Sequence, residues 1–343
     1  MMERGLLAAF GGPALAARVA VAAARHRLAR LDRLGNLHLF AGAELPTDLP
    51  NSDRIITGER FACPGFDGCA SRDWGSWLSF AAPWPGHLQV VRAPLTGLPL
   101  YWARASDGLL LFSHLALALD VGFRPQLDVE FLRHQLAYQN LRTERTGIAG
   151  VQELLPGTRL SCAGDDISVR CDWSPWVFAE KAYARASSSQ ELEQMVDACI
   201  SSWANSRSAI RVELSGGLDS SIVAASLGAA GADFSAVNVA TASPDGDERR
   251  YARAVAQCLD IDLAEALYSA ENCDLTQPPA FLSMRPASYA VLDGIDATLG
   301  AATTATGAAS LFSGIGGDNI FALTRSVAPV LDAYRARGPG ATM

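Results

Sequence analysis

The hydrophobic pattern changes character about halfway along the chain. In the first half, short apolar runs at 87–94, 98–105 and 108–119 are separated by Pro, Gly and Asp. Such runs predict short β-strands joined by turns. Residues 127–141 instead carry apolar side chains at helical spacing and predict one helix. We therefore expect residues 1–185 to form an α+β domain of antiparallel strands with some helix.

A serine-capped helix is predicted where the pattern changes. Residues 187–189 are three serines, a residue type that caps helix starts, and apolar residues then recur at helical spacing. The predicted apolar face carries Leu192, Met195, Val196, Cys199 and Ile200.

Strand and helix patterns alternate from there on. A strand at 210–214 leads into a glycine turn and a helix, and a strand at 234–241 leads into a helix from about Asp247. A further helical stretch, then a strand with a second glycine turn, completes the pattern. Alternation of this kind predicts a doubly wound parallel sheet. We place the domain boundary at 185/186, so that residues 186–343 form this second domain.

Charge and composition narrow the class of partner. The net charge is −8 and hydrophobic residues make up 49% of the chain. Nucleic acid is not expected as a partner, because phosphate backbones bind basic surfaces. Lys181 is the only lysine, so arginine supplies nearly all of the positive charge.

Neither the cysteines nor the N-terminal apolar stretch indicates an exported or membrane protein. The seven cysteines are dispersed and form no CxxC pair, as is typical of free thiols in a reducing compartment; a zinc site or a disulfide framework is the alternative. Residues 6–31 resemble a signal peptide, but Gly11, Gly12, Pro13 and Arg18 interrupt the apolar run. No apolar stretch is long enough to span a membrane without a charge or a breaker. We expect a cytoplasmic protein that binds no membrane.

Two glycine turns carry the candidate chemistry. They are Ser215-Gly216-Gly217 and the turn at 313–317, and each follows a predicted strand. Glycine admits close approach of the backbone to a ligand, and the N-terminus of a following helix attracts anions. In a parallel sheet, ligands bind at the carboxyl ends of the strands. The pattern therefore predicts a phosphate site.

Each turn also carries a carboxylate, which changes the expected ligand. Asp219 and Asp318 stand where phosphates would bind, and no lysine follows as it would in a P-loop. Two carboxylates beside a polyphosphate are suited to Mg²⁺, which takes oxygen ligands and shares them with a nucleotide. An ordinary strand-to-helix turn with an aspartate cap remains the alternative for each turn taken alone.

A family resemblance joins these features. Residues 215–221, SGGLDSS, resemble the pyrophosphate-binding loop of the N-type ATP pyrophosphatases. Together with SGIGGD at 313–318, they resemble the asparagine synthetase B family, which includes β-lactam synthetases and lasso-peptide macrolactam cyclases. The ending GGDNIF, with Asn319 in place of the usual glutamate, is most similar to the cyclase branch. Residues 97–119 and 150–160 are similar to the amidotransferase-like (Ntn-type) N-terminal domain of these proteins.

The resemblance implies a set of ligand contacts. Ser215, Gly217 and Ser220 would hold the β- and γ-phosphates of ATP, and Asp219 and Asp318 would hold Mg²⁺. The implied nucleotide-binding residues are Leu214, Ser215, Gly216, Gly217, Asp219, Ser220, Val239, Ser313, Gly314, Gly317 and Asp318.

Other positions carry weaker or no assignments. The helix entry at Asp247 and Glu248 also resembles the family, with helix-capping acids as the alternative. Arg285, Pro286 and Tyr289 are expected to face the acyl site. The residues that catalyse the reaction are not identified.

Two departures from the family pattern limit these expectations. The chain begins Met-Met-Glu-Arg, so removal of either Met exposes no cysteine nucleophile, and glutaminase activity is expected to be absent. Beyond the second turn, residues 320–343 carry no lysine, whereas the family has a lysine there, and Ile315 replaces a frequent glutamate. The second domain is therefore expected to be incomplete; completion by a second polypeptide, a truncated reading frame and loss of catalysis all remain open.

The resulting expectation is an ATP-dependent C–N ligase that releases AMP and closes a macrolactam ring in a lasso-type precursor peptide. A leader-recognition protein and a leader peptidase would be its partners. The alternatives are a non-catalytic nucleotide-binding protein and a ligase of the β-lactam or asparagine synthetase type.

Overall fold

The computed structural model describes nine segments of the chain and four single positions. They are residues 5–51, 53–62, 73–94, 98–138, 141–179, 188–241, 247–268, 282–286 and 290–320, with residues 331, 334, 335 and 338. The predicted boundary at 185/186, together with Lys181, Cys63, Cys69, Cys273 and Tyr289, lies outside these residues.

The chain forms two compact units. Unit 1 comprises Met1–Ala186 and Gln277–Ser288, and unit 2 comprises Ser187–Thr276 and Tyr289–Met343. A short piece of the second half of the chain thus belongs to the first unit, which no hydrophobic pattern indicated.

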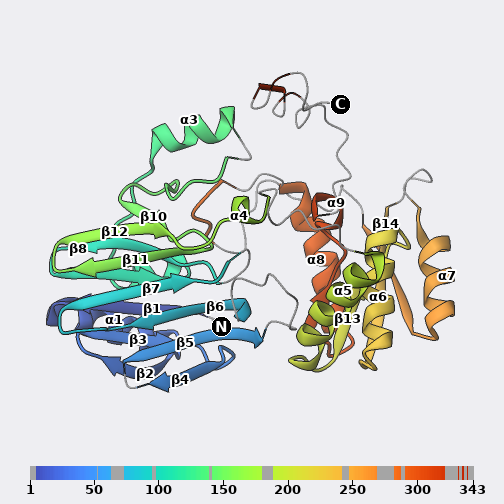
Figure 1. The fold of residues 1–343 in the computed structure, drawn as a ribbon, viewed down its shortest axis with the longest axis horizontal. Coiled ribbons are helices and arrows are strands. Elements are labelled where there is room, and N and C mark those ends of the chain that lie inside the picture. Colours follow the sequence, from blue (N-terminus) through green and yellow to red (C-terminus); the bar gives the residue numbers. More distant parts are fainter. Residues whose placement is uncertain are drawn as a thin grey trace. The chain divides into compact units, whose positions relative to one another are not determined.

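Unit 1 contains two antiparallel sheets (Figure 1). The first has the strand order β10 (Val151–Glu153), β8 (Tyr101–Ala105), β9 (Gly108–Phe112), β1 (Leu6–Gly11), β3 (Leu37–Ala41), β2 (Ala29–Leu34). The second has the order β12 (Asp166–Cys171), β11 (Thr158–Ala163), β7 (His87–Arg92), β6 (Asp73–Ala81), β5 (Arg54–Ala62), β4 (Thr47–Asn51).

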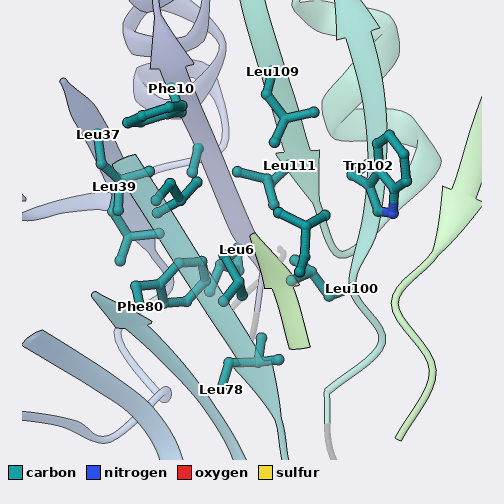
Figure 2. Packing of buried hydrophobic residues seen from close by; sticks show 14 of the residues in the cluster. Leu6, Phe10, Leu37, Leu39, Leu78, Phe80, Leu100, Trp102, Leu109 and Leu111 are labelled. Atoms are coloured by element: carbon teal, nitrogen blue, oxygen red, sulfur yellow. The ribbon is translucent and has the colours of Figure 1, made fainter. Parts of the chain in front are cut away.

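The core of unit 1 lies between these sheets. Figure 2 shows large side chains from both sheets packed together, among them Leu6 and Leu111 of the first sheet and Phe80 of the second. The opposite face of the first sheet packs against helices α1 (Pro13–Arg25) and α2 (Leu115–Asp120) in a second apolar cluster. Alternate residues of β1 therefore serve two cores, which explains why its run Leu6–Phe10 is apolar throughout.

The sequence predictions for unit 1 hold for the strands better than for the helices. β7 and β8 confirm the strands at 87–94 and 98–105. The prediction of strand throughout residues 108–119 is wrong, because only Gly108–Phe112 is strand, β9, and Leu115–Asp120 is helix α2. Leucine and alanine are good helix formers, so this run satisfies either pattern.

The remaining helices of unit 1 are short. The helix predicted at 127–141 is confirmed as the shorter α3 (Val129–Ala137), which begins where the Asp128 carboxylate accepts a hydrogen bond from the Phe131 amide at 2.9 Å. Helix α4 covers Trp176–Ala179. Along the described parts of the chain, no helix is both long and apolar enough to cross a membrane.

Unit 2 contains the predicted parallel sheet. Its strand order is β15 (Leu263–Tyr268), β14 (Phe234–Thr241), β13 (Ile210–Glu213), β16 (Ser310–Phe312), and every pairing is parallel. The helices are α5 (Ser189–Asn205), α6 (Leu218–Ala229), α7 (Arg249–Leu259), α8 (Ala290–Thr304) and α9 (Gly317–Ile320). Residues of α5, α6 and α7 share one apolar cluster with β13 and β14, whereas α8 packs against β14 and β15.

The serine cap of α5 is confirmed, but its apolar face is not fully buried. Ser188 accepts a hydrogen bond from the Glu191 amide, and the Glu191 carboxylate accepts one from the Ser188 amide. Leu192 and Met195, predicted to face the core, are 45% and 43% exposed. Helical spacing predicts that a face exists, but the neighbouring elements decide how much of it is covered.

Candidate functional site

The two glycine turns follow neighbouring strands of the parallel sheet. β13 pairs with β16 in the register Ile210–Ser310 to Val212–Phe312, so both strands end at the same edge. The strand order also reverses here, since β14 and β15 lie on one side of β13 and β16 lies on the other. In open α/β sheets this reversal creates the crevice in which ligands bind.

The first turn needs glycine at its centre. Gly216 has φ +82°, and a Cβ at this position would overlap the backbone of Tyr251 and Ala252 in α7. The turn is held by its own serine: the Gly217 amide donates to the Ser215 hydroxyl at 3.1 Å. Its conformation therefore follows from close packing against α7 as well as from local sequence.

The serine hydroxyls of this turn contact one another. The Ser215 and Ser220 Oγ atoms lie 3.0 Å apart, and the Ser215 amide donates to the Ser220 Oγ at 3.2 Å. The Ser221 hydroxyl donates to the Gly217 carbonyl at 2.6 Å. Helix α6 has Gly217 as its N-cap and no side-chain cap bond, which leaves amides at the helix start without a side-chain acceptor.

The second turn packs directly on the first. A Cβ at Gly314 would come within 2.5 Å of the Ser220 amide nitrogen, and a Cβ at Gly317 would overlap the Asp219 carboxylate. Glycine is thus required at Gly314, where a side chain would meet the backbone directly after the first turn, whereas a side chain at Gly317 would displace the Asp219 carboxylate. Residues that lie nearly a hundred positions apart in the sequence form one cluster at the sheet edge.

The structure brings the two predicted carboxylates to this cluster. Asp219 is half-buried beside Gly317, and the next residue in the chain, Asp318, is exposed. Among the described residues, no arginine or histidine forms an ion pair with either carboxylate, and no group of three or more His, Cys, Asp or Glu could hold a metal ion. A cation at this site would need further oxygen ligands from a bound molecule.

The remaining predicted residues lie on the strands leading to the cluster. Leu214 is buried, and its amide donates to the Val237 carbonyl at 2.8 Å. Val239 is half-buried on β14 beside β13, and Ser313 is half-buried directly after β16. Their predicted contacts with adenosine remain predictions.

Two polar residues near the cluster were not predicted. Asn238 is buried in β14 and donates from Nδ2 to the Leu214 carbonyl at 2.8 Å, which holds the end of β13. Its signal in the sequence is a single amide within the apolar run Ala236–Ala240. Burial raises the pKa of Glu213, which directly precedes Leu214, and the charge of Asp296 raises it further.

The structure also describes two residues with weaker assignments, Asp247 and Arg285. The Asp247 carboxylate accepts from the Arg249 amide at 3.2 Å and pairs with its guanidinium at 2.7 Å, so the helix-capping alternative describes Asp247. The Arg249 hydrogen bond holds the pKa of Asp247 at about 2. Arg285 donates to Glu153 of unit 1, and its expected place near an acyl site stays a prediction.

Comparison with known proteins gives one family match. Residues 191–328 match the family model described as asparagine synthase. No curated protein matches the chain.

Two solved structures resemble the chain weakly. They are an allosteric regulatory enzyme of purine biosynthesis and glutamine phosphoribosylpyrophosphate amidotransferase from B. subtilis, complexed with ADP and GMP. The first is 9% identical over 90% of this chain and 89% of that chain, with a TM-score of 0.30. The second is 8% identical over 90% of both chains, with a TM-score of 0.29. Scores this low bear on neither fold nor function. The family match, which spans both glycine turns, supports an asparagine synthetase-like family for residues 191–328.

Proposed function

We propose that this chain forms an amide bond by activating a carboxylate with ATP, with release of AMP and pyrophosphate. The observation that carries the proposal is the contact between the two glycine turns at the point where the strand order reverses. The asparagine synthase match supports ATP-dependent amide formation in general.

The nucleotide would bind with its phosphates at the first turn. Gly217 is exposed and leaves its backbone open to a phosphate, and the uncapped start of α6 supplies amide donors and a favourable dipole. The hydroxyls of Ser215 and Ser220, now bonded to each other, would exchange that bond for phosphate oxygens.

The residues present fit a magnesium ion shared with the nucleotide. The Asp219 carboxylate lies against Gly317, beside Asp318, and within the described residues no cation neutralises either acid. Bound there, Mg²⁺ would offset the charge that develops on the leaving pyrophosphate. Asp219 and Asp318 would hold it.

The substrate proposed is a precursor peptide that closes on itself. A side-chain carboxylate oxygen attacks the α-phosphorus of ATP, the bond to pyrophosphate breaks, and an acyl-adenylate forms. The peptide's own amine then attacks the acyl carbon, AMP leaves with the C–O electron pair, and the amine releases a proton. The peptide loses one water overall. Amine and adenylate held together replace a bimolecular encounter.

The macrolactam assignment rests on the similarity of GGDNIF to lasso-peptide cyclases. A leader-recognition protein and a leader peptidase are proposed as its partners on the same basis. A cytoplasmic location is proposed from the dispersed cysteines and the interrupted N-terminal apolar run.

The test is AMP formation by the purified chain with Mg-ATP and a precursor peptide encoded beside its gene. We expect AMP and a peptide lighter by one water. Asp219→Ala should reduce AMP formation by about two orders of magnitude or more, the loss typical of removing a key electrostatic group. Asp233→Ala is the matched control and should leave AMP formation unchanged, because Asp233 lies directly before β14 and so at the opposite end of the strands.

Other outcomes would redirect or reject the proposal. AMP without a change in peptide mass would support a ligase with another acceptor. ATP binding without AMP would support the non-catalytic alternative. Equal AMP formation by Asp219→Ala and the unmodified chain would reject the proposed site.

A further inference from the structure

A buried carboxylate in unit 1 is surrounded by three arginines. The Glu153 side chain is fully buried, and Arg92 donates to its Oε1 at 2.8 Å. Arg142 donates to the same oxygen, and Arg285 donates to Oε2 at 3.2 Å. Three positive charges around one negative charge exceed what is needed to compensate a buried acid.

One of these arginines comes from a distant part of the sequence. Arg285 lies in the segment 282–286, which belongs to unit 1 although both neighbouring elements, β15 and α8, belong to unit 2. The chain therefore passes between the units three times rather than once. Segment 282–286 lies between the second and the third of these passages.

The segment is attached to unit 1 by backbone, apolar and ionic contacts. The Met284 side chain is 3% exposed within the apolar cluster beneath α1 and α2. Its carbonyl accepts a hydrogen bond from the Gly147 amide at 2.8 Å. A Cβ at Gly147 would come within 3.2 Å of this carbonyl, so the two backbones approach closely.

Arg285 completes the attachment. Its Nη2 donates to the Thr143 carbonyl as well as to Glu153, and its guanidinium carbon lies 5.3 Å from the centre of the Phe131 ring. The arginine thus contacts a carboxylate, a carbonyl and an aromatic ring at once, which suits a planar group with several donors.

We infer that Glu153 and Arg285 form a buried clamp that fastens segment 282–286 to unit 1 and thereby links the stability of the two units. This segment lies between β15 and α8 in the sequence, so releasing the clamp removes a tether on the N-terminal side of α8. The free energy of local opening should then fall in α8 as well as near Gly147. The inference does not depend on the reaction proposed above.

The chain offers a variant that opens the clamp without exposing an uncompensated buried charge. In Arg285→Gln, Glu153 keeps Arg92 and Arg142 as partners, so unit 1 retains its own ion pair. The matched control is Arg159→Gln, which removes an arginine–carboxylate pair of unit 1, to Asp172 at 2.6 Å, that does not involve segment 282–286.

The experiment is amide hydrogen exchange on the full chain. We expect Arg285→Gln to accelerate exchange of the Gly147 amide and of the central α8 amides on the order of tenfold, the loss typical of a hydrogen bond to a charged group. Leu39, in the centre of the first sheet, should exchange as before. Arg159→Gln should change none of these amides.

Two results would overturn the inference. Faster exchange at Gly147 with unchanged α8 amides would make the contact local, without a link between the units. Unchanged exchange at both places would mean that Arg285 fastens nothing. Should Arg285→Gln not fold, Arg285→Lys, which keeps the charge but loses the planar donor set, carries the same test with a smaller expected acceleration.

Discussion

One carboxylate in each unit has surroundings opposite to those of the other. Glu153 in unit 1 is fully buried and bonded to three arginines, whereas Asp219 in unit 2 lies half-buried at a sheet edge beside glycine. Among the described residues, no cation pairs with Asp219. A carboxylate whose bonds are all satisfied within the fold serves structure, whereas one left facing glycine can accept a ligand's cation.

The apolar cores of the two units differ in the size of their side chains. Leucine and phenylalanine fill the space between the sheets of unit 1, whereas the core of unit 2 is rich in alanine, with Ala224, Ala236, Ala252 and Ala256 among its buried members. Small side chains let helices approach a sheet closely. Unit 1 therefore has the larger apolar core, and unit 2 has close backbone contacts around its two glycine turns.

The largest expected effect separates the two carboxylates. Glu153→Ala should destabilise unit 1 by about 3–5 kcal/mol, because it leaves buried arginines without their anion. Asp219→Ala should leave the free energy of unfolding nearly unchanged while abolishing AMP formation. Denaturant titrations followed by circular dichroism measure the stability of both variants, and an assay of AMP measures the activity. The comparison fails if Asp219→Ala is the more destabilising change.

Acidic pH should reduce the stability that Glu153 contributes to unit 1. Burial alone raises the pKa of Glu153, but hydrogen bonds from Arg142 and Arg92 outweigh it, and the net pKa lies below the ordinary value of 4.5. Since the folded pKa is depressed, the stability contributed by Glu153 is present above pH 4.5 and is lost as pH falls through the folded pKa.

Thermal unfolding between pH 7 and pH 3 measures this loss. We expect the unfolding temperature to fall toward acid pH and to fall less steeply in Glu153→Gln. Equal slopes for the two proteins would contradict the assignment.

A smaller effect tests the packing of the first glycine turn of unit 2 against α7. Gly216→Ala should destabilise unit 2 by about 2–4 kcal/mol, because alanine there meets both a positive φ and the α7 backbone. Gly231→Ala is the control: φ is +68° there, but nothing lies within 4 Å of a Cβ, so we expect only about 1 kcal/mol. Urea unfolding compares the two variants. Equal losses would show that the contact with α7 contributes nothing.

The smallest expected effect is at the start of unit 2. Ser188→Ala removes the capping box of α5 and should cost about 1 kcal/mol. Ser206→Ala, at the other end of the same helix, should cost less, because its hydroxyl donates to the Trp203 carbonyl and accepts from the Arg207 guanidinium but caps no amide at the helix start. Helix content on heating, measured by circular dichroism, distinguishes them.

Local patterns predicted the elements with strong signals. Strand 234–241 matches β14 at both ends, and the serine cap places the start of α5 within one residue. The run at 108–119 was ambiguous, since leucine and alanine fit a strand and a helix equally well and only packing on α1 and β9 decides between them. Strand β15 was not predicted. Three of its six residues are exposed, and exposed and covered positions do not alternate regularly along it, so the hydrophobic pattern of a strand is faint.

The sequence by itself determined the chemistry of the candidate site. Glycines, serines and acids at fixed spacing near Gly216 and Gly314 predict turns that admit a phosphate, because backbone freedom and hydroxyl groups are properties of the residues themselves. Only the tertiary structure decided which residues meet. Strand pairing places the two turns in contact, and the fold carries Arg285 across to Glu153, 132 positions away in the chain. Such contacts arise from long-range packing, which spacing along a sequence does not encode.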